Sequence, residues 1–260
     1  MPILTLPDYR IHYSLEGPTG APLLILSNSL GAELNMWNAQ VAEFSKQFRV
    51  LRYDNRGHGQ STAPPAPYTL EQVANDAALL LAHIGEKSAH FCGLSLGGMV
   101  GMWLATHRPE IINKLVLCNT SALLGPRENW DSRIATAQKE GMGALSKLMM
   151  ERWFTEGFRT YSADKVAPVE ESFLKVSVEG YVGCCAAIRE MDQRDAISQI
   201  KATTLVIAGT FDPSTPPAMG QFIVGAINGA RYVELPTAHL SNVEAAPAFN
   251  DVVSHFLAAA

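Results

Sequence analysis

The chain has 260 residues, of which 47% are hydrophobic and 17% are charged. This size and composition predict one large domain, or a core with an insertion, and argue against disorder. The formal net charge of -5 argues against nucleic-acid binding through a basic face, although one buried arginine could still recognise a small anion.

The location and redox features are those of a cytoplasmic protein. No apolar run approaches the roughly 18 residues of a membrane span, and MPILTLPDYR at the N-terminus has no basic segment leading into an apolar one. None of the four cysteines, at positions 92, 118, 184 and 185, belongs to a Cys-x-x-Cys pair. We therefore expect a cytoplasmic protein with buried thiols and no membrane partner.

Segments typical of strands and helices alternate over the first 120 residues. Apolar, strand-like runs lie at residues 21–29, 47–59, 88–95 and 112–120, and helix-like segments lie at 69–85 and 99–109. The first helix-like segment has apolar residues at helical spacing, with Thr69 as its predicted cap and Gly85 as its stop. This alternation predicts an α/β fold with a mainly parallel sheet and helices on both faces.

The alternation of strand-like and helix-like segments stops between residues 121 and 195. This region contains helix-like segments and no convincing strand, for example at 138–154 and 169–192. Strand-like runs return at 202–213 and 230–236, and a helix is predicted near the end, at 243–259. We therefore predict an α/β core formed by residues 1–120 and 196–260, with a helical cap at 121–195.

One glycine-rich stretch of the core has a serine at its centre. Residues 93–97 read Gly-Leu-Ser-Leu-Gly, the G-x-S-x-G pattern of a nucleophile elbow. In such an elbow the serine lies on a sharp strand-to-helix turn, and the glycines leave room for strained backbone. An incidental serine in a glycine-rich turn is the alternative. The strand before and the helix after favour Ser95 as a nucleophile.

A serine nucleophile needs a base and an acid that orients the base, and in this class they follow in the order Ser, Asp or Glu, His. Among the histidines after Ser95, His107 ends a predicted helix and His255 lies inside another, whereas His239 lies in a polar loop after a strand. Asp212 directly follows an apolar strand. We predict Ser95, Asp212 and His239 as the catalytic triad.

An oxyanion formed at this serine needs two backbone amides. One is predicted at Leu96, the residue after the nucleophile. The other is expected in the loop SNSLG after an early strand, with Leu30 preferred and Ser29 or Gly31 left open.

The pair Asp54 and His58 resembles a second acid and base. Both precede the serine and lie in the glycine-rich loop YDNRGHGQS, so we interpret them as structural. The histidines are scattered singly along the chain, and we predict no metal site.

These motifs together resemble those of the α/β-hydrolase superfamily. The segments GLSLGG, YDNRGHGQS, AGTFDPSTP and PTAHLSNVEAAPAFN carry the resemblance over nearly the whole chain outside the insertion, although Asn28-Ser29 stands where many members have His-Gly. The segments SNSLG and GYVGCCAAIREMD, together with Trp37, also resemble the 3-oxoadipate enol-lactonases of bacterial aromatic degradation.

The resemblance implies hydrolysis of a small anionic enol-lactone to 3-oxoadipate, in the β-ketoadipate pathway, without a cofactor. A substrate carboxylate would require a cation in the pocket, and we predict Arg133 for this role, with Arg189 and Arg194 as alternatives. Trp130, Trp153 and Met150 are predicted to complete the substrate site. The sequence leaves the oligomeric state open, including a homo-oligomer.

Other functions fit the same residues. A general carboxylesterase or a cofactor-free haloperoxidase-type hydrolase would use the same triad, and a pocket without a cation would favour them. A ligand receptor that keeps the fold and triad but turns over slowly is an alternative outside enzymology. The serine at the elbow disfavours epoxide hydrolases and haloalkane dehalogenases, which need a carboxylate there.

Overall fold

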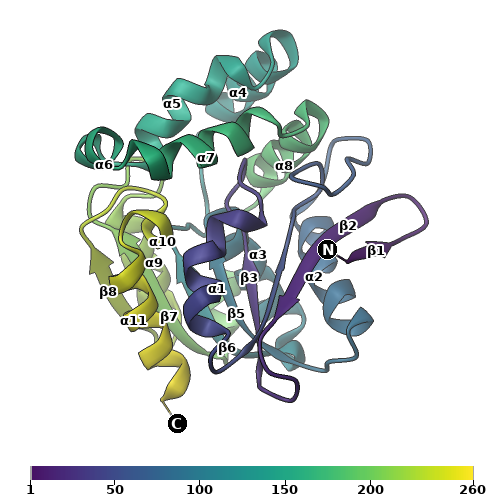
Figure 1. Ribbon diagram of the computed structural model, residues 1–260, viewed down its shortest axis with the longest axis vertical. Helices are drawn as coiled ribbons and strands as arrows, with labels where there is room; N and C mark the ends of the chain where they lie inside the picture. Colours follow the sequence, from purple (N-terminus) through teal and green to yellow (C-terminus); the bar gives the residue numbers. More distant parts are fainter. Residues whose placement is uncertain (1, 260) are drawn as a thin grey trace.

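The computed structural model describes residues 2–259. Within these residues it has an eight-stranded sheet in the order β1-β2-β4-β3-β5-β6-β7-β8 (Figure 1). β1 pairs with β2 and β2 with β4 in antiparallel fashion, and every later pair is parallel. The strands are β1 (Ile3–Thr5), β2 (Arg10–Glu16), β3 (Leu23–Ser27), β4 (Arg49–Tyr53), β5 (Ala89–Leu94), β6 (Ile112–Cys118), β7 (Thr203–Gly209) and β8 (Arg231–Leu235).

Helices cover both faces of this sheet. α1 and α11 pack against each other on one face, and α2 and α3 pack together on the other (Figure 1). The helices of the core are α1 (Asn38–Phe44), α2 (Leu70–His83), α3 (Leu96–His107), α9 (Pro217–Ala226), α10 (Ser241–Glu244) and α11 (Ala246–Ala258). Short 3-10 turns are η1 (Leu34–Trp37), η2 (Pro109–Ile111) and η3 (Ala196–Gln199). The α/β fold predicted from the sequence is confirmed.

Local sequence signals explain the helix boundaries in α2. The Thr69 side chain accepts a hydrogen bond from the Gln72 amide, and the Gln72 side chain accepts one from the Thr69 amide, which forms a capping box. Gly85 follows the helix with φ +79, a conformation that favours glycine. The last predicted helix is instead divided at Ala245, between α10 and α11, just before Pro247.

Five helices lie between β6 and β7 in sequence and form a layer above the carboxyl ends of the strands (Figure 1). They are α4 (Arg127–Glu140), α5 (Gly143–Trp153), α6 (Glu156–Tyr161), α7 (Ala163–Leu174) and α8 (Val178–Glu190). We call α4–α8 the cap. The cap closes the end of the sheet where the loops after the parallel strands gather.

The sheet order reverses direction at β3. The chain passes from β3 to β4 on one side and then to β5 on the other. Loops that leave neighbouring strands in opposite directions open a crevice, and ligands of open α/β sheets bind there. The loop after β3 and the turn after β5, which hold Leu30 and Ser95, meet at this place.

Candidate active site

Ser95 lies at the strained turn that its motif predicts. It joins β5 to α3 with φ 57 and ψ -113, a backbone conformation that non-glycine residues rarely adopt. A Cβ atom at Gly93 would come within 2.1 Å of the Gly97 carbonyl oxygen, and one at Gly97 would come equally close to the Ser27 oxygen. Only glycine fits at these two positions, so the motif allows strand, turn and helix to pack closely around the serine.

The loops after β7 and β8 bring Asp212 and His239 together. Nδ1 of His239 lies 2.7 Å from Oδ2 of Asp212, and both residues are 3% exposed. The other carboxylate oxygen, Oδ1, accepts hydrogen bonds from the amides of Ser214 and Thr215. Burial raises the pKa of Asp212, but the charge and hydrogen bond of His239, together with hydrogen bonds from the Thr215 hydroxyl and amide, outweigh it and hold the pKa below its usual value. The carboxylate therefore stays ionised and can orient the imidazole.

Ser95 and His239 line the same cavity beneath the cap. The cavity has a volume of about 260 Å³, which suits a small ring-shaped ligand. Within residues 2–259 the Ser95 hydroxyl makes no hydrogen bond within 3.5 Å. A nucleophile and its base are often loosely aligned without substrate, so the shared cavity leaves proton transfer between them feasible. The catalytic roles of Ser95, Asp212 and His239 stay a prediction.

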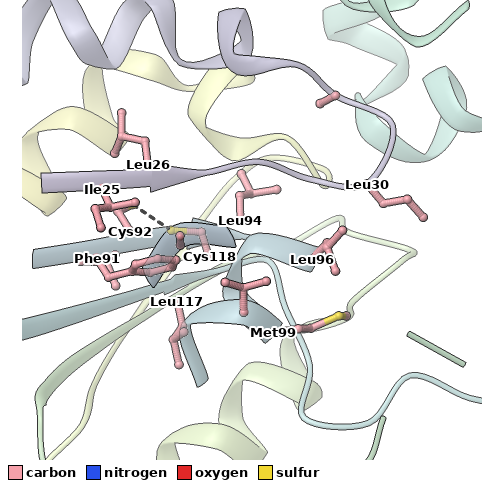
Figure 2. Close-up of a cluster of buried hydrophobic side chains, with 14 of the residues drawn as sticks. Ile25, Leu26, Leu30, Phe91, Cys92, Leu94, Leu96, Met99, Leu117 and Cys118 are labelled. Atoms are coloured by element: carbon pink, nitrogen blue, oxygen red, sulfur yellow. Dashed lines mark hydrogen bonds between the residues drawn. The ribbon is translucent and has the colours of Figure 1, made fainter. Parts of the chain in front are cut away.

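The amides of Leu30 and Leu96 are free to bind an oxyanion. Neither amide donates to an acceptor in the described part of the chain. The Gly31 amide, one of the alternatives, instead donates to Nε2 of His58 at 2.9 Å. Figure 2 shows Leu30 and Leu96 at the same end of the strands, and the segments that hold them are joined by a 3.0 Å hydrogen bond from the Gly97 amide to the Asn28 oxygen. This geometry disfavours Gly31, and Leu30 and Leu96 stay the predicted donors.

Comparison with known proteins identifies the family. A family model described as the alpha/beta hydrolase fold matches residues 22–246. The chain belongs to the α/β-hydrolase family. It is 40% identical to 3-oxoadipate enol-lactonase 2 of Acinetobacter baylyi, over 96% of this chain and 94% of that protein. 3-oxoadipate enol-lactonase 1 of the same organism is 32% identical, over 94% and 91% of the two chains.

A solved structure agrees with these relatives. The crystal structure of the enol-lactonase from Burkholderia xenovorans has a TM-score of 0.98 and 43% identity, and the match covers 99% of this chain and 100% of that one. The predicted α/β-hydrolase fold and the predicted family are confirmed. The protein is an enzyme of the carboxylic-ester hydrolase class.

Three of the four cap residues predicted to bind substrate line the cavity of this α/β-hydrolase. They are Trp130, Arg133 and Trp153. The guanidinium of Arg133 stacks over the Trp130 ring at 4.7 Å, as expected for residues three apart on one helix face. Met150 is not among the residues that line this cavity, whereas its neighbour Met149 is. Because a helix turns about 100° per residue, Met150 lies well away from the face that carries Met149.

The two alternative cations lie elsewhere. Arg189 bonds to Asp131 at 2.5 Å, and Arg194 bonds to Asp192 at 2.6 Å, on the surface of the protein. Neither arginine lines the cavity with Ser95.

Arg152 was not predicted and also lines the cavity, on the α5 face that carries Met149. Like Arg133, it is only partly buried, and no carboxylate oxygen of the described residues lies within 4.0 Å of either guanidinium. Burial, and then the like charge of Arg133, lower the pKa of Arg152. The sequence gives no local signal for Arg152, since its neighbour Trp153 lies about 100° away around the helix. The cavity is therefore lined by two arginines that are not paired with any carboxylate of the described residues.

Two further residues hold the site in place. The Asn119 amide group donates to Oδ2 of Asp212 at 3.0 Å, from a backbone with φ 44 at the end of β6. The Glu244 carboxylate accepts hydrogen bonds from the Ala238 amide and from the amide and hydroxyl of Thr155 in the cap. The Leu240 amide donates to the Trp153 oxygen at 3.0 Å, so the loop of His239 is fixed to the cap on both sides.

Among residues 2–259, no helix is both long and apolar enough to cross a membrane. The same residues contain no group of three or more His, Cys, Asp or Glu side chains placed to hold a metal ion. All four cysteines are buried and free, as predicted, with Cys92 and Cys118 in contact on β5 and β6 (Figure 2).

Proposed function

We propose that this α/β-hydrolase is a serine enzyme that opens the enol-lactone of 3-oxoadipate to 3-oxoadipate, in the β-ketoadipate pathway of aromatic degradation. The observation that carries the proposal is the pair of arginines, Arg133 and Arg152, that face the cavity of Ser95 without a carboxylate partner. The names of the relatives and of the Burkholderia structure support the same substrate.

The arginine pair selects for an anionic substrate. Two like charges in a partly dehydrated cavity repel each other, and a bound carboxylate would relieve both the repulsion and the loss of hydration. A guanidinium presents several N–H donors in one plane and matches the two oxygens of a carboxylate. Trp153 and Met149 supply apolar surface for the lactone ring in the same cavity. A ring that carries one carboxylate fits this combination.

The first chemical step forms an acyl-enzyme. Ser95 Oγ attacks the lactone carbonyl carbon while Nε2 of His239 takes its proton, and Asp212 stabilises the resulting imidazolium through Nδ1. The developing oxyanion accepts hydrogen bonds from the Leu30 and Leu96 amides. The ring C–O bond then breaks and His239 returns the proton to the leaving enol oxygen.

The second step frees the enzyme. The enol leaving group stays attached to the acyl chain, so ring opening releases no separate product. His239 takes a proton from water, the hydroxide attacks the acyl carbon, and Ser95 leaves with the proton. Ketonisation of the product enol makes the reverse reaction unfavourable. These steps use only side chains and amides of the chain, together with water.

A panel of three substrates tests the proposal. The enol-lactone of 3-oxoadipate carries a carboxymethyl group where α-angelica lactone carries a methyl group, and 4-nitrophenyl acetate is a neutral ester. We expect kcat/KM for the carboxylated lactone to exceed that for α-angelica lactone by roughly 100-fold, because hydrogen bonds to charged groups contribute about 1.5–3 kcal/mol each. Ser95→Ala should lower kcat by at least roughly 1000-fold on all three.

Each contrary result has a distinct meaning. Equal or better turnover of the neutral ester would replace the lactonase by a general carboxylesterase. Rapid labelling of Ser95 by a fluorophosphonate, without steady-state turnover of any substrate, would indicate a receptor. Full activity of Ser95→Ala would remove the serine mechanism.

A further inference from the structure

His58 lies next to the loop of residues 28–31 that holds the predicted donor Leu30, which we call the oxyanion loop, although His58 takes no part in the mechanism above. It follows β4 and is fully buried. Its Nε2 lies 2.9 Å from the Gly31 amide nitrogen, and its Nδ1 lies 2.9 Å from the Arg56 carbonyl oxygen. The imidazole therefore bridges the loop after β4 and the loop after β3.

These two hydrogen bonds determine the protonation state of the ring. A carbonyl oxygen can only accept, so Nδ1 carries the proton, and an amide can only donate, so Nε2 carries the lone pair. Burial lowers the pKa of His58, and this outweighs the opposing effects of the Arg56 carbonyl and the Asp54 charge. The neutral ring with its proton on Nδ1 is thus the form that the site accommodates.

The bond to Gly31 fixes the residue that follows the predicted oxyanion donor. On the other side of Leu30, Asn28 is anchored by four hydrogen bonds. Its side chain donates to the Tyr53 oxygen at 2.7 Å and accepts from Trp37 Nε1 at 2.9 Å. Its carbonyl oxygen accepts from the Gly97 amide and, at 3.5 Å, from the Asn55 side chain. Leu30 therefore lies between two anchored points, Asn28 and Gly31.

Gly31 has little freedom to find another arrangement. Its φ is +86, and a Cβ atom there would approach the Phe173 ring of the cap to 2.8 Å. The Gly31 amide belongs to the peptide plane that follows Leu30, so its hydrogen bond orients the backbone on the carboxyl side of the donor. Loss of this bond would leave the Leu30 amide held only by Asn28 and by the turn in which the Ala32 amide donates to the Ser29 oxygen.

We propose that His58 is a positioning residue for the reaction, and that its unprotonated Nε2 holds the Gly31 amide so that the Leu30 amide points at the oxyanion. This inference rests on the proposed serine mechanism and oxyanion donors, but not on the lactone substrate. His58 touches no reacting atom and acts through the loop.

Replacing His58 by glutamine or by asparagine, whose side chains carry an amide group, separates the roles of the two ring nitrogens. In His58→Gln the side-chain oxygen can reach the former position of Nε2 and accept from Gly31. In His58→Asn the shorter amide can donate to the Arg56 oxygen, as Nδ1 does, but cannot reach Gly31. With 4-nitrophenyl acetate we expect kcat to fall roughly 10- to 100-fold in His58→Asn, with KM within about threefold, because a donor displaced by about 1 Å costs that order of rate. His58→Gln should keep kcat within about fivefold of the wild type.

His12 provides a matched control. It is also a buried histidine, 2% exposed, and its Nδ1 lies 2.6 Å from Oδ2 of Asp54. Among residues 2–259, its side chain makes no hydrogen bond to the oxyanion loop. His12→Asn should lower the melting temperature and leave kcat unchanged below it. A fall in kcat in His12→Asn equal to that in His58→Asn would overturn the proposal, since any disturbance of the network would then suffice.

The proposal is also overturned if His58→Asn and His58→Gln have equal kcat, or if KM changes in place of kcat. A measurement on the wild-type enzyme does not depend on how the variants fold: long-range ¹H–¹⁵N spectra should show the proton of His58 on Nδ1, and a proton on Nε2 would overturn the proposal. If only the lactone substrate were wrong, the difference in kcat between His58→Asn and His58→Gln would still be observed with the neutral ester. Failure of the substrate proposal can therefore be distinguished from failure of the His58 proposal.

Discussion

The core and the cap differ in whether their arginines are paired with a carboxylate. In the core, Arg56 is 8% exposed and bonds to Asp76, with Nε 2.7 Å from Oδ2 and Nη2 2.8 Å from Oδ1. Its guanidinium also stacks on the Tyr9 ring at 4.4 Å and donates to the Gln72 oxygen. In the cap, Arg133 and Arg152 face a cavity and have no carboxylate within 4.0 Å in the described residues.

The presence or absence of a carboxylate partner distinguishes an arginine that stabilises the fold from arginines that are available to bind a ligand. A buried charge needs a partner, and Arg56 has a bidentate one from α2, so it joins the loop after β4 to that helix. The cap arginines are kept where the fold provides no partner, in the cavity of the predicted nucleophile. A folded chain maintains such a pair only at a cost in stability, and binding of an anion would offset that cost.

The largest effect is expected where the paired charge is broken. Asp76→Asn leaves the Arg56 guanidinium buried without its anion, and removal of one partner of a buried ion pair typically costs about 3–5 kcal/mol. The free energy of unfolding, measured by urea denaturation, should fall by that amount, and KM should stay unchanged at temperatures where the variant is folded.

The matching change in the cap should have the opposite result for stability. Arg152→Met removes one of two like charges, so the free energy of unfolding should be unchanged or higher. If Arg152→Met destabilised the fold as much as Asp76→Asn, the cap arginines would be structural and the comparison would fail.

A smaller effect, on binding alone, is expected for the unpaired cations. Arg133→Met and Arg152→Met should each raise KM for the enol-lactone of 3-oxoadipate by about 10- to 100-fold, the equivalent of one charge-assisted hydrogen bond of about 1.5–3 kcal/mol. KM for α-angelica lactone, which has no carboxylate, should change by less than about threefold. Steady-state kinetics on both lactones measure the difference, and equal changes on the two would remove the arginines from carboxylate binding.

Those features of the site that depend on local chemistry could be predicted from the sequence. The pattern around Ser95 restricts the backbone, and the required order of acid and base leaves few choices after it, so Asp212 and His239 could be selected by elimination. The alternation of strands and helices likewise predicts the parallel sheet. The hairpin of β1 and β2 was not predicted. β1 has only three residues, and the buried stretch of β2 includes the polar residues His12 and Ser14, which weaken its apolar pattern.

Residues whose role depends on how helices are oriented could not be predicted. Packing of the cap over the core determines which face of α5 points to the cavity. The sequence analysis therefore named Met150, whereas Met149 and Arg152 line the cavity. Asn119 ends a strand that is adjacent to β7 only in the folded sheet, so its bond to Asp212, 93 residues away, has no local signal. The role inferred for His58 required the tautomer that its two hydrogen bonds define.

The smallest effect is expected at Arg189, which tests whether a cation in the cap matters for its charge or for its place. Arg189 bonds to Asp131 and Glu190 on the surface, and hydrogen bonds to these two carboxylates raise its pKa. Exposed ion pairs contribute little because water and salt screen them. Arg189→Ala should therefore leave both the melting temperature and KM for the carboxylated lactone unchanged. A rise in KM like that of Arg133→Met would show that the net charge of the cap attracts the substrate, and the absence of a partner would then no longer identify the functional arginines.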